Sequence, residues 1–252
     1  MIPELDERGY ALWPSRLEGE ELAELARLFA DWPSGRPGQR IDPARAAALA
    51  GVRRLCTAMA PFMGERLRPV RAILFDKQDG VNWALGWHQD RTIEVAERRD
   101  VEGFGPWTVK QGRVHVAPPV SLLERMVTVR LHLDPVDADN APLLVAPGSH
   151  RLGLIAEDAI AGVVDRLGEA VCLAGAGTIW LYRTLILHAS ARSSPGRHRR
   201  VLQIDLCADD LPGGLHYAME DTAKPDGVVG VPSGGSNDTL GRCDGAPLMR
   251  DA

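Results

Sequence analysis

A histidine and an aspartate stand two residues apart in the segment GWHQDRTIEV, residues 86–95. Positions i and i+2 of an extended chain point to the same side, so His88 and Asp90 can reach one ion if this segment is extended. A His-x-Asp pattern also occurs by chance on surface turns. The pair therefore predicts a metal site only if the rest of the chain supplies further ligands.

A further histidine, His188, ends a strand-like run, and the next such run, RRVLQIDL, begins at Arg199. Strand alternation puts Arg199 on the same face as Gln203 and Asp205, and it turns Arg200 to an apolar face. We expect the polar face to line an interior cavity. Arg199 then points into the same space as His188.

Two histidines and one carboxylate with open coordination positions are typical of non-haem Fe(II) oxygenases. His88, Asp90 and His188 provide that ligand set. A nearby arginine suits a co-substrate carboxylate, because its planar guanidinium can bind both oxygens. The residues therefore predict an iron site with Arg199 as an anion-binding side chain.

The elements that must position these residues change type along the chain. Ser15–Glu18 has the form of a capping box before leucines at helical spacing, and Trp32-Pro33 is expected to end that helix. Asp42-Pro43 predicts the start of an alanine-rich helix that runs to about Met63. From Arg71 onward short β-like runs follow, at 71–77, 126–134, 142–148, 170–183 and 200–207. This order predicts an antiparallel sandwich or barrel with the N-terminal helices packed outside.

Two segments depart from the strand pattern. Residues 91–119 form a long connection, which we expect to be a lid without regular structure. Within it, Phe104 and Trp107 are apolar groups able to cover a cavity. Residues 221–252 are rich in Gly, Pro and Ser and predict a loop-like tail.

Composition excludes several classes of protein. The 252 residues are 45% hydrophobic and 25% charged, which predicts a sizeable globular core. A net charge of -5 offers no basic patch for nucleic acid or a membrane surface, and no run is apolar enough to span a bilayer. The N-terminus lacks the pattern of a signal peptide, and four scattered cysteines form no CxxC pair. We therefore expect a cytoplasmic monomer or homodimer that acts on a small molecule, and not on nucleic acid or a membrane.

Four pieces of the sequence together resemble the phytanoyl-CoA dioxygenase (PhyH) family of Fe(II)/2-oxoglutarate-dependent oxygenases. The pieces are FDK at 75–77, NWALGWHQD at 82–90, NAPLLVAPGSHR at 140–151 and LHASARSSPGRHRRVL at 187–202. The similarity extends from about residue 70 to 217. It implies a mainly β fold, a double-stranded β-helix or jelly-roll barrel. We accordingly predict one domain with a jelly-roll core from about residue 70 to 210.

The resemblance also implies roles for particular residues. Arg199 is expected to bind the distal carboxylate of 2-oxoglutarate, with Ser190 hydrogen-bonding the same group. Lys77 and Asn82 stand in motif positions, which implies further co-substrate contacts; the alternative for Lys77 is a solvated surface charge, as for most lysines. The implied ligands of Fe(II) are His88, Asp90 and His188. Family members often have Gly where this chain has Ala141.

Thr128, Arg130 and His132 share a polar face of MVTVRLHLD. They either line the cavity, where they touch 2-oxoglutarate or substrate, or form an interior polar network. His150, in a PGSHR turn, is expected to be structural.

Two functions from different classes follow from these residues. The first is an oxygenase that uses Fe(II), 2-oxoglutarate and O2 to hydroxylate an unactivated C–H bond. Its substrate would be a metabolite, an amino-acid derivative or an acyl compound, and succinate and CO2 would be released. The alternative is a metal- or ligand-binding jelly-roll protein that has lost catalysis. Turnover of 2-oxoglutarate with Fe(II) present separates the two.

Overall fold

The computed structural model describes residues 2–30 and 36–218. The expected helix end at Trp32-Pro33 and the tail at 221–252 lie outside the described residues. Within them, no helix is long and apolar enough to cross a membrane.

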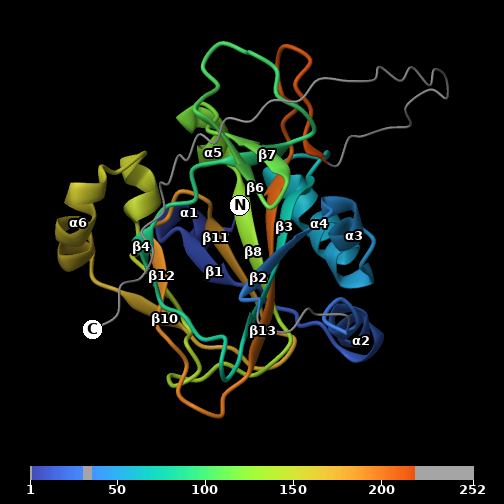
Figure 1. The fold of residues 1–252 in the computed structure, drawn as a ribbon, viewed down its shortest axis with the longest axis vertical. Helices are drawn as coiled ribbons and strands as arrows, with labels where there is room; N and C mark the ends of the chain where they lie inside the picture. Colours follow the sequence, from blue (N-terminus) through green and yellow to red (C-terminus); the bar gives the residue numbers. More distant parts are fainter. Residues whose placement is uncertain (1, 31–35, 219–252) are drawn as a thin grey trace, which may run out of the picture. The chain divides into compact units, whose positions relative to one another are not determined.

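Two antiparallel sheets carry the fold, with helices beside them (Figure 1). The six-stranded sheet has the order β1 (Tyr10–Leu12), β11 (Ile179–Arg183), β8 (Val127–His132), β13 (Arg199–Cys207), β3 (Arg68–Lys77) and β2 (Gly38–Ile41). The four-stranded sheet has the order β10 (Ala170–Cys172), β9 (Leu143–Val145), β12 (His188–Ser190) and β4 (Leu85–His88). The predicted β-like run at 170–183 is thus two strands, β10 and β11, which belong to different sheets.

The two faces of β13 differ as its alternating sequence predicts. β13 pairs with β3 on one side and β8 on the other. Leu202 and Ile204 point outward into the apolar core, whereas Arg199 and Gln203 line an interior cavity. The predicted polar inner face is therefore confirmed.

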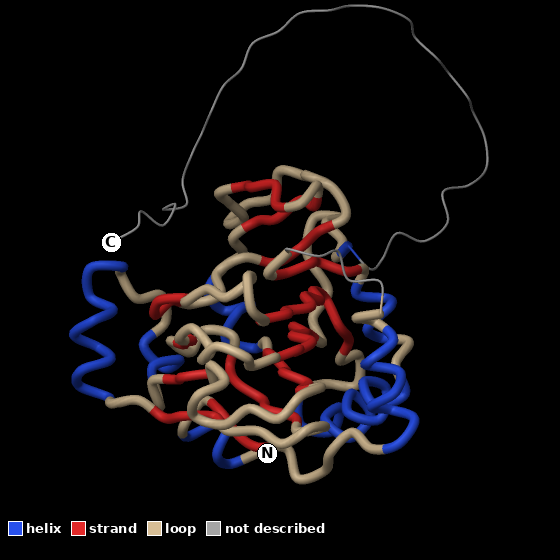
Figure 2. The backbone as a smooth tube through the Cα atoms, turned by 60° about the horizontal axis from the view of Figure 1, so that its bottom comes forward, coloured by secondary structure: helices blue, strands red, loops and turns tan. Residues whose placement is uncertain are grey.

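Helices cover the outer face of the six-stranded sheet, and strands fill the centre between helices (Figure 2). Leu25, Leu55 and Met59 of the N-terminal helices are fully buried in one core with Val129 and Ile204 of the sheet. The helices are α1 (Pro3–Glu7), α2 (Gly19–Arg27), α3 (Pro43–Ala47), α4 (Ala50–Met63), α5 (Val120–Arg125) and α6 (Ile160–Leu167). Two short 3₁₀ turns, η1 (Ser149–Leu152) and η2 (Glu157–Ala159), precede α6.

Two helix boundaries differ from the sequence prediction. The expected capping box at Ser15–Glu18 is wrong, because α2 begins at Gly19 and Glu18 makes no side-chain cap bond. The Ser15 hydroxyl instead accepts a hydrogen bond from Arg54. The cap at Asp42 is confirmed, since its carboxylate accepts from the Ala44 amide at 2.8 Å. The helix that follows is nevertheless broken into α3 and α4.

The segment 91–119 is not the irregular lid that the sequence predicts. It contains a three-stranded antiparallel sheet in the order β5 (Ile93–Val95), β7 (Arg113–Val116) and β6 (Trp107–Lys110). Phe104 and Trp107 pack against a second apolar core instead of covering the cavity. A two-residue turn, Gln111-Gly112, joins β6 to β7 with φ angles of 53° and 76°. Both angles are left-handed, as a tight hairpin turn of this kind requires.

Candidate metal centre

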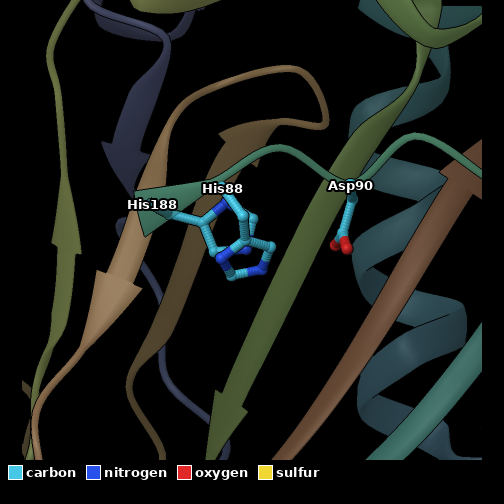
Figure 3. A group of neighbouring side chains, drawn as sticks. All are labelled: His88, Asp90 and His188. Atoms are coloured by element: carbon cyan, nitrogen blue, oxygen red, sulfur yellow. The ribbon is translucent and has the colours of Figure 1, made fainter. Parts of the chain in front are cut away.

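Three side chains, two on neighbouring strands and one just after β4, converge on one point in the cavity. His188 on β12 is directly opposite His88 on β4, and their ring centroids lie 4.2 Å apart. Asp90 follows β4 after one intervening residue. One ligand atom from each of the three lies within 4.8 Å of the others, so the group can hold one metal ion. Figure 3 shows the three side chains pointing toward a common space.

Backbone carbonyls fix the orientation of both imidazoles. Nδ1 of His88 lies 2.8 Å from the carbonyl oxygen of Gly86, and Nδ1 of His188 lies 3.0 Å from that of Ile186. A carbonyl oxygen only accepts, so each Nδ1 carries the proton and donates it. The lone pair of each Nε2 is therefore free to bind a metal.

Asp90 is held by two side chains of the six-stranded sheet. Arg71 of β3 donates to its carboxylate at 2.8 Å, and Gln203 of β13 donates to the same oxygen at 3.2 Å. Arg71 also forms an ion pair at 2.6 Å with Asp205, which is buried behind it. Asp205 in turn accepts a hydrogen bond from Thr128 at 3.0 Å. This chain of contacts joins the third candidate ligand to the centre of the main sheet.

The protonation states suit metal binding. Burial, followed by the charge of His88, lowers the pKa of His188 to about 3, so its imidazole is neutral at neutral pH. Burial alone would raise the pKa of Asp90, but Arg71 and the two histidines outweigh it and hold that pKa below its usual range. Two histidines and one carboxylate are the ligand set of the 2-His-1-carboxylate iron sites.

Gln89 explains why its two neighbours share one side. Its amide donates to the carbonyl oxygens of Gly153 and Leu185 at 2.8 and 2.7 Å, and it accepts from the Ile155 amide at 2.9 Å. The buried Gln89 side chain thus fastens the segment on the face opposite the ligands. The sequence analysis missed this residue, although alternation between His88 and Asp90 indicates that it points the other way.

A group of buried cations occupies the same interior. Arg199, which is 2% exposed, donates to the carbonyl oxygen of Ala141, and its Nε is buried without a partner. Lys77, opposite Arg199 on β3, donates to the Ser190 hydroxyl at 3.1 Å. Arg130 of β8 lies on the same face, and its Nε is also unpartnered. Within residues 2–30 and 36–218, no ion pair joins Lys77, Arg130 or Arg199 to a carboxylate.

The absence of a neighbouring acid is reflected in the ionisation of these groups. Burial, followed by Arg199 and Arg130, lowers the pKa of Lys77 to about 6. Burial, followed by Arg130, lowers the pKa of Arg199 to about 9. Three basic groups that disfavour one another's charged forms lie together in a buried space, and a bound anion would favour those charged forms.

The remaining predicted site residues lie one layer behind the cavity. Asn82 exchanges hydrogen bonds with the backbone of Ser193, at 2.6 and 2.9 Å, and so holds the loop after β12. Thr128 bonds to Asp205 and to Thr184. His132 is buried, and both of its ring nitrogens lack a partner.

Outside this layer, the ring of His150 contacts the carbonyl oxygen of Asp6 at 3.3 Å. This contact is consistent with the structural role expected for His150. Ala141 has a φ of 47°, in the left-handed region where glycine is favoured. The family that the sequence resembles often carries glycine at this position.

The cavity has a volume of about 450 Å³. Its walls include the three candidate ligands, Arg130, Ser190 and Arg199. It also includes Arg71, Arg40 and Lys110, which the sequence analysis missed. Arg71 shares the strand parity of Lys77 and was detectable from sequence, whereas 38–41 shows no strand pattern that would reveal Arg40.

Comparison with known proteins identifies the fold. EctD from S. alaskensis, solved with 2-oxoglutarate and 5-hydroxyectoine, is similar at a TM-score of 0.60 and 18% identity, over 82% of this chain and 74% of that chain. AviO1 from Streptomyces viridochromogenes Tue57 is similar at 0.54 and 20% identity, over 84% and 94%. The epimerase SnoN from nogalamycin biosynthesis is similar at 0.52 and 16% identity, over 84% and 88%. At these identities the likeness concerns the fold, and the predicted jelly-roll architecture is confirmed.

Sequence comparison gives a more direct result. No curated protein is significantly similar to the chain in sequence. The model of the family described as Phytanoyl-CoA dioxygenase (PhyH) matches residues 5–201, well over half of the chain. The chain therefore belongs to the phytanoyl-CoA dioxygenase family and is a 2-oxoglutarate-dependent non-haem iron dioxygenase.

Proposed function

We propose that the protein hydroxylates an unactivated C–H bond of a small-molecule substrate and holds Fe(II) through His88, Asp90 and His188. The observation that carries this proposal is the placement of two sites in one cavity. A group of ligand atoms within 4.8 Å of one another lies beside buried cations that have no acidic partner. One site suits a divalent metal, and the other suits an anionic co-substrate.

The residues around the metal position act by orientation. Bound Fe(II) supplies the activation of dioxygen and of 2-oxoglutarate that leads to oxidation of the substrate and release of succinate and CO2. The carbonyls of Gly86 and Ile186 keep both Nε2 atoms directed at the metal. Arg71 and Gln203 hold the Asp90 carboxylate in place and keep it ionised.

Arg199 is proposed to bind the distal carboxylate of 2-oxoglutarate, because its guanidinium is buried and its Nε has no partner. Ser190 and Lys77 are hydrogen-bonded to each other and would share that carboxylate. Arg130 completes the cationic wall. Asn82 and Thr128 remain predicted co-substrate contacts, and their hydrogen bonds to Ser193 and Asp205 favour a supporting role.

The test is formation of succinate from 2-oxoglutarate by the purified protein with Fe(II) and O2. His188→Ala removes one of three ligands and should abolish succinate formation while circular dichroism stays unchanged. His198→Ala is the matched control, because His198 is near β13 but pairs with Asp76 outside the cavity. Succinate formation by His188→Ala at the parent rate would overturn the ligand assignment.

Hydroxylation is distinguished from other outcomes by product analysis. SnoN, which has a similar fold, is an epimerase, so the fold alone does not fix the reaction. We expect a substrate selected from a metabolite panel to gain one oxygen atom derived from ¹⁸O₂. Tight binding of 2-oxoglutarate without turnover would instead support the non-catalytic alternative.

A further inference from the structure

The charges that line the cavity are strongly unbalanced. Among its lining residues, Asp90 is the single carboxylate. The cationic lining residues are Arg40, Arg71, Arg91, Lys110, Arg130 and Arg199. Most of these cationic side chains have a partner in the protein or a role in the proposed 2-oxoglutarate site. The cations that have neither indicate what else the cavity binds.

Four of the six cations are accounted for. Arg71 pairs with Asp90 and Asp205. Arg91 donates to the carbonyl oxygen of Ile155. Arg130 and Arg199 belong to the proposed 2-oxoglutarate site. Two cations are left, Arg40 on β2 and Lys110 at the end of β6.

Neither Arg40 nor Lys110 has a side-chain partner in the part of the chain that the structure describes. The Nε of Arg40 is buried without a hydrogen bond, which is costly for a charged donor. Glu94 and Asp90 are both close enough to influence Arg40. Glu94 does not line the cavity and is bonded to Arg113, and Asp90 is already bonded to Arg71 and Gln203. A buried, unpartnered guanidinium donor facing a cavity indicates a ligand with acceptor atoms.

The β6–β7 hairpin places the two cations together. The Gln111 side chain, next to Lys110, accepts from the Arg40 amide at 3.0 Å and donates to the Gly38 carbonyl at 3.3 Å. The hairpin tip is thereby fastened to the edge strand β2. Lys110 is exposed but lines the cavity, where partial desolvation, followed by the charges of Arg71 and Arg40, lowers its pKa, so these cations act on one another.

The sheet register separates this pair from the proposed 2-oxoglutarate site. Arg40 is opposite Ile73, and Ile73 is opposite Gln203, the residue that bonds Asp90. Arg40 is therefore two strands from Gln203, or about 10 Å across the sheet. Arg199 lies four residues from Gln203, or about 13 Å along β13. Seen from the candidate metal ligands, Arg40 therefore lies across the strands, whereas Arg199 lies along them.

We propose that Arg40 and Lys110 form a second oxyanion site, which binds a carboxylate or phosphate group of the primary substrate. The guanidinium offers a planar pair of donors and the ammonium a point charge, a combination suited to either group. The substrate is then an anionic small molecule whose reacting carbon reaches the metal while its anionic group stays on β2 and β6. This inference rests on the proposed function, because it assigns the other cations to 2-oxoglutarate.

The test is calorimetric binding of two probes, inorganic phosphate and acetate, to the full chain. The protein is first loaded with Mn(II) and 2-oxoglutarate without oxygen, so that the Arg199 site is filled. We expect one saturable site, with binding weakened about tenfold in Arg40→Gln and in Lys110→Gln, as for loss of one charge-assisted contact. Arg45→Gln is the matched control, because Arg45 is exposed on α3 and outside the cavity; its binding should match the parent.

Each outcome is informative. Tighter phosphate binding indicates a phosphorylated substrate, and tighter acetate binding indicates a carboxylic acid; both support the site. Equal affinity in the parent and in Arg40→Gln, or no saturable binding to the parent, would overturn it. If the parent bound neither Mn(II) nor 2-oxoglutarate, the proposed function would be wrong. The anion site would still be supported if the parent bound the probes and the Arg40 and Lys110 variants did not. Melting temperatures of all variants verify folding.

Discussion

Arg199 and Arg200 are adjacent in sequence but meet different surroundings, because alternate residues of β13 face opposite ways. Arg199 is 2% exposed and keeps an unpartnered Nε in the cavity. Arg200 points away and forms a two-pronged contact with Asp134, at 2.9 and 2.6 Å. An anion in the cavity can therefore meet the first arginine and not the second.

Arg199→Lys should raise the KM for 2-oxoglutarate about tenfold or more, because lysine keeps the charge but loses the planar pair of donors. Arg200→Lys is the control and should leave that KM within about twofold of the parent. A twofold change corresponds to much less free energy than one hydrogen bond to a charged group contributes. Steady-state succinate formation measures both. Equal effects at the two positions would contradict the orientation of β13.

Lys77 predicts a pH dependence of stability. Burial and the neighbouring arginines lower its pKa to about 6 from an ordinary value of 10.5. Between these values the unfolded chain binds a proton that the folded protein does not, so stability rises with pH in this window. The contribution of Lys77 to stability is fully present above its pKa in the unfolded chain, 10.5, and is lost as the pH falls toward its pKa in the folded protein, about 6.

The measurement is the urea midpoint of the protein without metal or 2-oxoglutarate, at about pH 6.5 and about pH 8.5. The midpoint of the parent should rise more than that of Lys77→Met, which keeps the side-chain length and removes the titrating group. Bound 2-oxoglutarate should reduce the difference, because an anion favours the protonated amine. Identical pH slopes in the two proteins would show that Lys77 is not held in this environment.

At the level of residues, the sequence predicts what lies along one strand and misses what lies across strands. His88 and Asp90 follow from the two-residue period, and so does the inward face of β13. Arg40 comes near Asp90 only because β2 pairs with β3, and Gly38–Ile41 is too short to show a period. Such contacts depend on the order of strands in the sheet, which no local pattern encodes.

At the level of elements, the segment 91–119 shows why the expectation of an irregular lid fails. Its strands are three or four residues long, and each is too short for clear alternation. The signal that was available is WTVK-QG-RVHV, two short runs joined by two residues with glycine second. The segment still borders the cavity, but through Arg91, Thr92, Lys110 and Gln111 and not through Phe104 and Trp107.

Gln111→Asn tests whether the hairpin tip is fastened to β2 by the glutamine amide. Asparagine tolerates the left-handed turn better than glutamine but is one methylene shorter. We expect both contacts to β2 to be lost. Each hydrogen bond contributes a net stabilisation of about 0.5–1.5 kcal/mol, so hydrogen exchange at the Arg40 amide should become about tenfold faster. Thr108→Ala, an exposed change on β6, is the control. Unchanged protection in Gln111→Asn would mean that other contacts hold the hairpin.

At the level of the whole molecule, the metal position connects the two main sheets. His88 and His188 belong to the four-stranded sheet. Asp90 is bonded by Arg71 and Gln203, which belong to the six-stranded sheet. A metal bound by all three ligands would therefore link one sheet to the other. It would stabilise the folded state and not the unfolded state, because the unfolded chain does not bring these residues together.

This connection predicts a thermal shift on metal binding. At a Mn(II) concentration about a hundred times its dissociation constant, the folded state gains about 2.7 kcal/mol. For a chain of this size that corresponds to a rise in Tm of about 5–10 °C. EDTA should reverse the rise, and His188→Ala should lack it because only two ligands remain. An equal rise in His188→Ala would place the stabilising metal elsewhere, and the link between the sheets would then have to come from protein contacts alone.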